Sequence, residues 1–165
     1  MAEISIIIDT REQHPYLFDA WKANTSVAGL PAGDYSLPGF EDRAAVERKS
    51  LDDLVGCLMG KDRERFEREL ARGRAYELFA VVIEANLQDI ARGVYTSNMK
   101  PEAALQSITA FYIRYGVPFL FCGHRAGGEY MTYSLFAKYL YEAEKRFKQL
   151  WKAQTITHKS GMNVV

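Results

Sequence analysis

The sequence is poor in the residues that build zinc sites and disulfides. Its 165 residues include two cysteines, Cys57 and Cys122, and three histidines. Each cysteine lies in an apolar context without the CxxC or Cys/His spacing of a zinc site, and a chain of this length does not need a disulfide. The histidines, His14, His124 and His158, lack a mutual spacing suited to a metal. We therefore expect two reduced core thiols and no zinc.

Long apolar runs and targeting signals are also missing. No apolar stretch reaches the roughly 20 residues that a membrane-spanning helix needs. The N-terminus lacks the basic segment followed by an apolar one that marks a secretory signal. These absences predict a cytoplasmic, chromosome-associated protein with no membrane partner.

Neither sign of charge is in excess, because 21 Lys and Arg stand against 21 Asp and Glu. A protein that only coats nucleic acid usually carries a strong basic excess, so the balance speaks against that class. An enzyme acting on DNA is not excluded. Carboxylates that hold metal ions lower the net charge, while local basic patches still contact phosphates. The 48% of hydrophobic residues fits one compact domain with its own core.

Hydrophobic patterns predict strands that alternate with helices. We expect strands at residues 4–9, 44–49, 79–84 and 117–122, and turns with short strands in the Pro- and Gly-rich stretch between the first two. Helices are expected at 51–74 (one or two), 101–115 and 133–152, with a turn at 123–128 before the last one. This order predicts an α/β fold with a mixed central sheet flanked by helices. The domain should span residues 1–154, and 155–165 should form a flexible tail.

Three carboxylates are expected at strand ends, where sites collect in α/β sheets: Asp9, Asp34 and Glu47. Because side chains alternate along a strand, Glu47 and Lys49 should point the same way and Arg48 the other. Carboxylate oxygens suit Mg²⁺ or Mn²⁺, which polarise a phosphoryl group and activate water. Lys49 could orient that water or stabilise charge on the phosphate. The set suits hydrolysis of a phosphodiester.

Each piece alone has a plainer explanation. A Gly-Asp-Tyr sequence is usually a turn, and Glu-Arg-Lys is usually a solvated run of charges. Here, however, the three charges end the apolar run Ala-Ala-Val, and placing them at the end of a buried strand requires a reason.

The order Gly33-Asp34, Glu47-Arg48-Lys49 and then Asp53 resembles the GD…ERKxxxD signature of the XPF/Hef family of structure-specific endonucleases. The similarity extends upstream to the segment IIDTRE at 7–12 and downstream to SLDDLVG at 50–56. It covers about residues 4–84 closely, and the remainder only in the order of strands and helices.

The resemblance implies a restriction-endonuclease-like nuclease core. Asp9, Asp34 and Glu47 would be metal-site carboxylates for Mg²⁺ or Mn²⁺, and Lys49 the catalytic lysine. Four further residues match the family motifs and would support the site: Arg11, Glu12, Arg48 and Asp53. Arg48 would contact phosphate or act as an ion-pair partner, and Asp53 would act from behind the metal ligands.

The family also has a DNA-contacting arginine in the helix after the signature, and both Arg63 and Arg65 fit that place. The other charges of residues 61–74 read as a solvated helix with i,i+4 pairs. Glu84 ends a predicted strand and could approach the metal site, although a plain strand-end carboxylate is the simpler interpretation.

The expected partner is DNA, branched or flapped DNA included. Many family members add a tandem helix-hairpin-helix domain, and no such pattern is seen in this sequence. We therefore expect a homodimer, through the aromatic-rich helices at 101–115 and 133–151, or a separate partner subunit to position the DNA. Two alternatives keep the fold but change the function: a catalytically inactive DNA-binding or scaffolding subunit, and a restriction- or phage-type nuclease acting on unbranched DNA.

Overall fold

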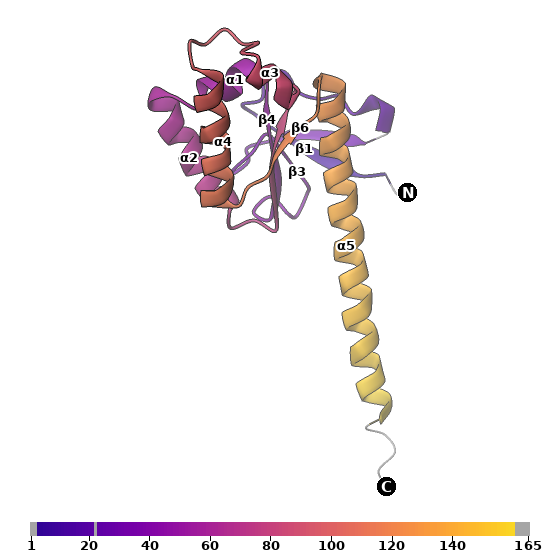
Figure 1. Cartoon of the computed structure of the whole chain (residues 1–165). Helices are drawn as coiled ribbons and strands as arrows, with labels where there is room; N and C mark the ends of the chain where they lie inside the picture. The colour runs from indigo at the N-terminus through magenta and orange to yellow at the C-terminus, as the bar shows by residue number, and fades with distance from the viewer. Residues whose placement is uncertain (1–2, 22, 161–165) are drawn as a thin grey trace.

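The computed structural model describes residues 3–21 and 23–160, with side chains up to residue 154. One six-stranded sheet runs through the domain. Helices α1, α2, α3 and α4 lie on one side of it and α5 on the other (Figure 1). The expected α/β fold with a mixed sheet is confirmed.

The strands are β1 (Ser5–Asp9), β2 (Asn24–Ala28), β3 (Tyr35–Ser36), β4 (Ala44–Lys49), β5 (Leu78–Ile83) and β6 (Phe119–Phe121), arranged in the order β2-β1-β3-β4-β5-β6. The pairs β1·β2, β4·β5 and β5·β6 are parallel, whereas β3 is antiparallel to both β1 and β4. The chain therefore turns back on itself at β3. This reversal brings the segment after Gly33 against the end of β4.

A 3-10 turn, Asp19–Trp21, follows β1, and the helices are α1 (Leu51–Gly56), α2 (Gly60–Gly73), α3 (Leu87–Ala91), α4 (Pro101–Tyr115) and α5 (Arg125–Ser160). Ser50 begins α1 by accepting a hydrogen bond from the Asp53 N–H. Pro101 occupies the first position of α4, and Gly116 ends that helix with φ of 68°.

Alternating side chains of the sheet divide the core into two layers. Ala45 of β4 packs with Phe79, Val81 and Ile83 of β5 against α1, α2, α3 and α4. Ala44 and Val46 face the opposite way, into a cluster with Phe136 of α5. Residues of β4 beyond Val46 continue this alternation, which decides the side of the sheet on which each charged side chain lies.

The helix at 101–115 was predicted with its observed bounds, and the four expected strands lie within two residues of their observed ends. Helix α5 differs from the prediction. It begins at Arg125, so the expected turn at 123–128 is already helical from there, and it continues through Ser160 where a flexible tail was expected. Residues 161–165 lie outside the described part of the chain.

Two glycines explain the hidden start of α5. A Cβ at Gly127 would collide with the Cys122 carbonyl oxygen, and one at Gly128 with the Tyr16 hydroxyl. These glycines reflect close packing of the first helical turn rather than a loop. Cys57 and Cys122 are both free, as expected. Within the described residues, no helix is both long enough and apolar enough to cross a membrane.

Candidate active site

Glu47 and Lys49 share one face of β4, and their side chains meet. Lys49 Nζ lies 2.5 Å from Oε1 of Glu47, and the two side chains are 15% and 5% exposed. The ammonium also lies 5.4 Å from the centre of the Phe66 ring of α2. The same-face arrangement predicted from strand alternation is confirmed. Almost all of this ion pair is shielded from water.

Asp34 reaches Glu47 through the antiparallel contact of β3 with β4. The Asp34 N–H donates to the Val46 carbonyl at 2.9 Å, and Oδ2 of Asp34 accepts from the Arg48 N–H at 2.7 Å. The turn before it requires glycine, because Gly33 has φ of 77° and a Cβ there would lie 3.0 Å from the Val46 oxygen. Gly33-Asp34 thus brings a carboxylate beside the end of β4.

Burial and the charges of neighbouring carboxylates raise the pKa of both carboxyl groups. The pKa of Asp34 rises from 3.8 to about 6, chiefly through burial, which its hydrogen bond from the Arg48 N–H and the Lys49 charge oppose. The pKa of Glu47 rises well above its usual value because of burial and the nearby Asp34 charge. Burial alone would lower the pKa of Lys49, but the Glu47 carboxylate raises it. The Lys49 ammonium therefore stabilises the ionised form of both carboxyl groups.

This donor set fits a hard divalent cation. Within the described residues, the hydrogen bonds found for the pair involve Oδ2 of Asp34 and Oε1 of Glu47. Oδ1 of Asp34 and Oε2 of Glu47 are left for another ligand. A cation there would offset the repulsion that raises both pKa values. Asp34 and Glu47 are the residues that would hold Mg²⁺ or Mn²⁺.

Asp9 has a different environment from the one expected for a metal ligand. Its carboxylate accepts from the N–H and the guanidinium of Arg11 at 2.6–3.1 Å, and from the Leu30 N–H at 2.6 Å. Burial would raise the pKa of Asp9, but these hydrogen bonds lower it overall. Among the described residues, no group of three or more Asp, Glu, His or Cys is arranged to hold a metal. The three-carboxylate set expected from the sequence is therefore not assembled in this structure.

The reason is that both oxygens of Asp9 are already engaged. Arg11 also donates to the Leu30 carbonyl at 3.0 Å, so the Asp9–Arg11 pair fixes the segment that leads into Gly33-Asp34. In this structure Asp9 and Arg11 fix the loop that carries Asp34, and of the three expected metal ligands Asp34 and Glu47 lie near the end of β4.

Arg48 points to the opposite face of the sheet and takes the ion-pair role, one of the two expected for it. Its guanidinium contacts Glu12 at 2.8 and 3.2 Å and Glu84 at 3.2 Å. Glu12 and Glu84 are 5% and 12% exposed. Hydrogen bonds and charge from Arg48 lower the pKa of Glu12, although burial would raise it. Glu12 thus supports the site through Arg48.

Asp53 lies at the first turn of α1 and is exposed. Oδ2 of Asp53 accepts a hydrogen bond from the Ser50 hydroxyl at 2.6 Å. The Asp53 N–H in turn donates to Oγ of Ser50 at 3.2 Å. Asp53 therefore orders the start of the helix that follows Lys49. Among the described contacts, those of Asp53 cap α1 rather than reach Asp34 or Glu47, so its expected role behind the ligands stays a prediction.

The two candidate arginines of α2 differ in their contacts. Arg63 donates to the Leu58 carbonyl and to Ser107 of α4, pairs with Glu67, and lies 4.6 Å from the centre of the Phe111 ring. Arg65 is 73% exposed, and its one ion pair, with Asp62, spans 3.6 Å. Arg63 binds α2 to α4, whereas Arg65 is accessible to an external phosphate.

Sequence reasoning missed two residues near the site. Oε1 of Glu69, on α2, accepts from the Gly33 N–H at 3.3 Å, and its charge contributes to the raised pKa of Asp34 and of Glu47. The signal was its helical spacing from buried Phe66, which places Glu69 on the side that faces the sheet. Arg125, the first residue of α5, pairs with Glu84 at 3.3 Å. No local sequence pattern predicts this contact.

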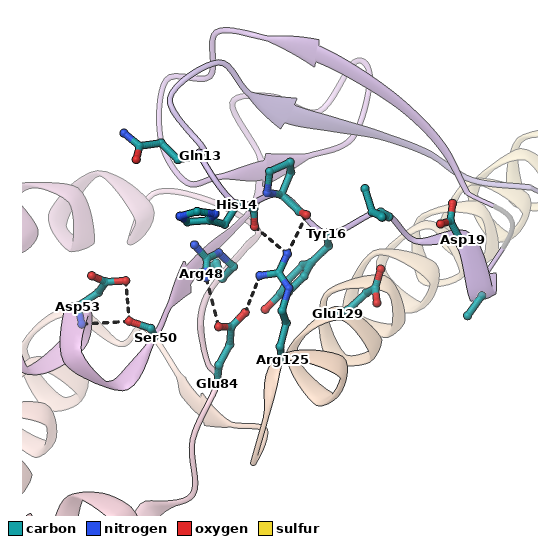
Figure 2. Close-up of a pocket in the computed structure, with 13 residues that line it drawn as sticks. Gln13, His14, Tyr16, Asp19, Arg48, Ser50, Asp53, Glu84, Arg125 and Glu129 are labelled. Carbon is teal, nitrogen blue, oxygen red and sulfur yellow. Dashed lines mark hydrogen bonds and ion pairs between the residues drawn. The ribbon is translucent and has the colours of Figure 1, made fainter. Parts of the chain in front are cut away.

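An open cavity of about 920 Å³ lies beside the Arg48 side chain (Figure 2). Its lining includes Tyr16, Ser50, Asp53, Glu84, Arg125 and Glu129. Because Arg48 points away from Glu47 and Lys49, the cavity adjoins the ion-pair network rather than the carboxylate–lysine cluster.

The family model of the ERCC4 domain matches residues 8–134, which contain the whole cluster. The chain belongs to the ERCC4 domain family. The resemblance to the XPF/Hef nucleases, read from the signature residues, is thereby confirmed.

Solved structures similar to this ERCC4 domain include two XPF structures. One is XPF from Aeropyrum pernix, with 20% identity and a TM-score of 0.64 over 79% of this chain and 59% of that chain. The other is XPF from Aeropyrum pernix in complex with DNA, with 20% identity and a TM-score of 0.60 over 81% of this chain and 63% of that one. The chain spans less than two thirds of either. Among curated proteins, no sequence matches it.

Proposed function

We propose that this ERCC4 domain is a divalent-metal-dependent endodeoxyribonuclease that hydrolyses phosphodiester bonds in DNA, branched or flapped DNA included. The observation that carries the proposal is the Glu47–Lys49 ion pair at the end of β4 with the Asp34 carboxylate bound to the intervening Arg48 N–H. The buried Glu47 and the half-buried Asp34, both with raised pKa values, form with one paired lysine a polar site that a folded domain has no structural need for.

Each residue of the site has a separate proposed role. Asp34 and Glu47 would hold Mg²⁺ or Mn²⁺, which when bound polarises the phosphoryl oxygen and activates water. The Lys49 ammonium, held between Glu47 and the Phe66 ring, is fixed in place to orient that water or to stabilise charge on the phosphate. Asp9 and Arg11 hold the loop that carries Asp34.

Two observations support DNA as the substrate. Exposed basic residues of α2, Arg65 among them, offer contacts to phosphate beside the site. A similar domain, XPF from Aeropyrum pernix, has been solved in complex with DNA. The formal net charge of zero implies modest affinity that salt weakens strongly.

We also propose that a second copy of the chain, or a separate partner subunit, helps to position the DNA. Tyr112 and Ile113 of α4 are 51% and 77% exposed. They adjoin the edge strand β6, where Phe119 and Phe121 line a shallow apolar groove with Tyr112. Tyr141, Phe147 and Leu150 of α5 are exposed as well. Tyr115 of α4 and Tyr139 of α5 instead pack against the core of the domain.

A catalytically inactive scaffold is disfavoured because every position of the GD…ERKxxxD signature is filled. A nuclease for unbranched DNA shares the chemistry and differs in substrate. The test is incubation of the purified chain with labelled duplex, flap, fork and single-stranded DNA, with and without Mg²⁺, beside the Lys49→Met variant. Metal-dependent cleavage by the wild type alone supports the proposal. Binding of DNA without cleavage, under all conditions, would favour the scaffold.

A further inference from the structure

Glu84 and Arg125 lie outside the signature, yet both are connected to it by ion pairs. Glu84 follows β5, and Arg125 is the first residue of α5. Oε1 of Glu84 lies 3.3 Å from Nη1 of Arg125, and its Oε2 lies 3.2 Å from Nη1 of Arg48. The carboxylate therefore stands between two guanidinium groups (Figure 2).

Arg125 also holds the segment that follows β1. Its Nη2 donates to the carbonyl oxygens of His14 and Pro15 at 2.9 and 2.8 Å, and its guanidinium lies 4.9 Å from the centre of the Tyr16 ring. One side chain of α5 thus contacts both the residue that follows β5 and the segment that follows β1. Glu12, the other partner of Arg48, belongs to that same segment.

The four side chains form a neutral network of two carboxylates and two guanidinium groups: Glu12, Arg48, Glu84 and Arg125. All but Arg125 are nearly buried, with side-chain exposures of 5–12%. Removing one member would leave a buried charge without compensation. The network is therefore expected to keep a single geometry.

Arg48 connects the ion-pair network to the proposed metal ligands. Its guanidinium is fixed on one face of β4, and its backbone N–H donates to Oδ2 of Asp34 at 2.7 Å. Its chain neighbours are Glu47 and Lys49. The orientation of the Arg48 peptide therefore sets the carboxylate of Asp34 and the directions of the two side chains beside it.

We propose that Glu84 and Arg125 are positioning residues for DNA cleavage, acting through Arg48 on the Asp34–Glu47–Lys49 cluster. The proposal rests on the nuclease function proposed above. It makes the start of the long helix α5 part of the support of the active site, although neither residue touches the reacting groups.

The experiment compares Arg125→Met, Glu84→Gln and the double variant with Arg146→Met as control. Arg146 lies on the same helix and makes an exposed ion pair with Glu77 at 3.6 Å. Its replacement therefore removes a cationic contact between α5 and the rest of the domain without touching the network. The measurements are kcat, KM for DNA, half-saturating Mg²⁺ and melting temperature. Glu84→Gln keeps the side-chain shape, so the same measurements on this variant test the proposal if Arg125→Met folds poorly.

We expect kcat to fall about tenfold in either single variant, with a higher half-saturating Mg²⁺ and an unchanged KM. The double variant should lose no more than the worse single variant, because both residues act through one contact. Arg146→Met should keep the wild-type kcat. Variants that cleave like the wild type, or whose kcat falls only as far as that of Arg146→Met, would overturn the inference. A wild type that does not cleave would instead contradict the proposed function.

A second readout needs neither metal nor cleavage. Amide hydrogen exchange over residues 44–50 should be faster in metal-free Arg125→Met than in the wild type, because the Arg48 N–H is held less firmly. Arg146→Met should leave this segment as protected as in the wild type. Equal protection in both variants would contradict a positioning role.

Discussion

Lys49 and Glu47 form an ion pair of 2.5 Å on one face of β4, with both side chains largely shielded from water. The pair means that the lysine is not a surface charge that happens to follow a glutamate. Its ammonium offsets the buried Glu47 charge and is itself fixed in direction. A single residue therefore supports both the ionisation of a proposed metal ligand and the proposed stabilisation of the reacting phosphate.

Replacing Lys49 with Met should lower kcat about 100-fold or more, because one fixed cationic donor is lost from the transition state. Mn²⁺ affinity, measured by calorimetry, should stay the same or increase, since a competing cation has been removed. Near-normal turnover would show that the ammonium has no part in the chemistry.

Replacing Asp34 with Asn should weaken Mn²⁺ binding and lower turnover together. The change replaces a charged carboxylate with a neutral amide, whose oxygen can take the place of Oδ2 and accept the hydrogen bond from the Arg48 N–H, so the loop should keep its place. Calorimetry and initial rates at saturating Mn²⁺ separate the two effects. Wild-type metal affinity in this variant would remove Asp34 from the metal site.

Replacing Asp9 with Asn should lower stability rather than metal affinity. The buried carboxylate and its bonds to Arg11 and Leu30 would be weakened, which should lower the free energy of unfolding by about 1–3 kcal/mol. Mn²⁺ affinity of the folded protein should change little, because both oxygens of Asp9 are engaged elsewhere. A loss of affinity as large as that of Asp34→Asn would restore Asp9 as a metal ligand.

The raised pKa of Asp34 predicts a pH-dependent stability in the absence of metal. Because this pKa is about 6 in the folded protein against 3.8 ordinarily, the folded state binds the proton more tightly than the unfolded chain does. This contribution favours folding at low pH and is lost as the pH rises through about 6. It should amount to about 1–3 kcal/mol between roughly pH 4 and pH 7.

Denaturant unfolding of the wild type and of Asp34→Asn across that range measures this contribution as the difference between the two slopes. Asp34→Asn should lose less stability than the wild type as the pH rises. Mg²⁺ should stabilise the wild type more at the upper end of the range, where Asp34 is ionised and competes less with protons for the cation. Parallel pH profiles for the two proteins would contradict the raised pKa.

The two arginines of α2 should separate DNA binding from stability. Arg65→Ala should weaken DNA binding and reduce the salt slope by about one charge, with little change in melting temperature. Arg63→Ala should lower the melting temperature instead, because Arg63 joins α2 to Leu58 and to Ser107 of α4. Fluorescence anisotropy over a salt series, beside thermal melts, tests the assignment. Reversed effects would make Arg63 the phosphate contact.

Local pattern was enough to predict β1, β4, β5 and β6, the bounds of α4 and the shared face of Glu47 and Lys49, but not the short helix α3. These features follow from alternation along β4 and from spacing along the helices, which depend on neighbouring residues alone. The Gly33-Asp34 turn was recognised for the same reason. A positive φ and a carboxylate beside the next strand are both local properties.

Contacts between distant segments were harder to predict. Asp9 looked like a third metal ligand until its bond to Leu30, 21 residues away, was seen to occupy its carboxylate. The pairing of Glu84 with Arg125 joins residues 41 positions apart, and no periodicity carries that information. The first turn of α5 was missed because Gly127 and Gly128 resemble a loop, whereas close packing selects them.

The most direct test of the central claim is the initial rate of DNA cleavage before EDTA, after excess EDTA, and after Mg²⁺ is restored in excess. The site at Asp34 and Glu47 predicts that chelation abolishes cleavage and that Mg²⁺ restores it, with Mn²⁺ able to substitute. The Asp34→Asn variant should remain inactive at the Mg²⁺ concentration that restores the wild type. Undiminished cleavage by the wild type in excess EDTA would contradict the account.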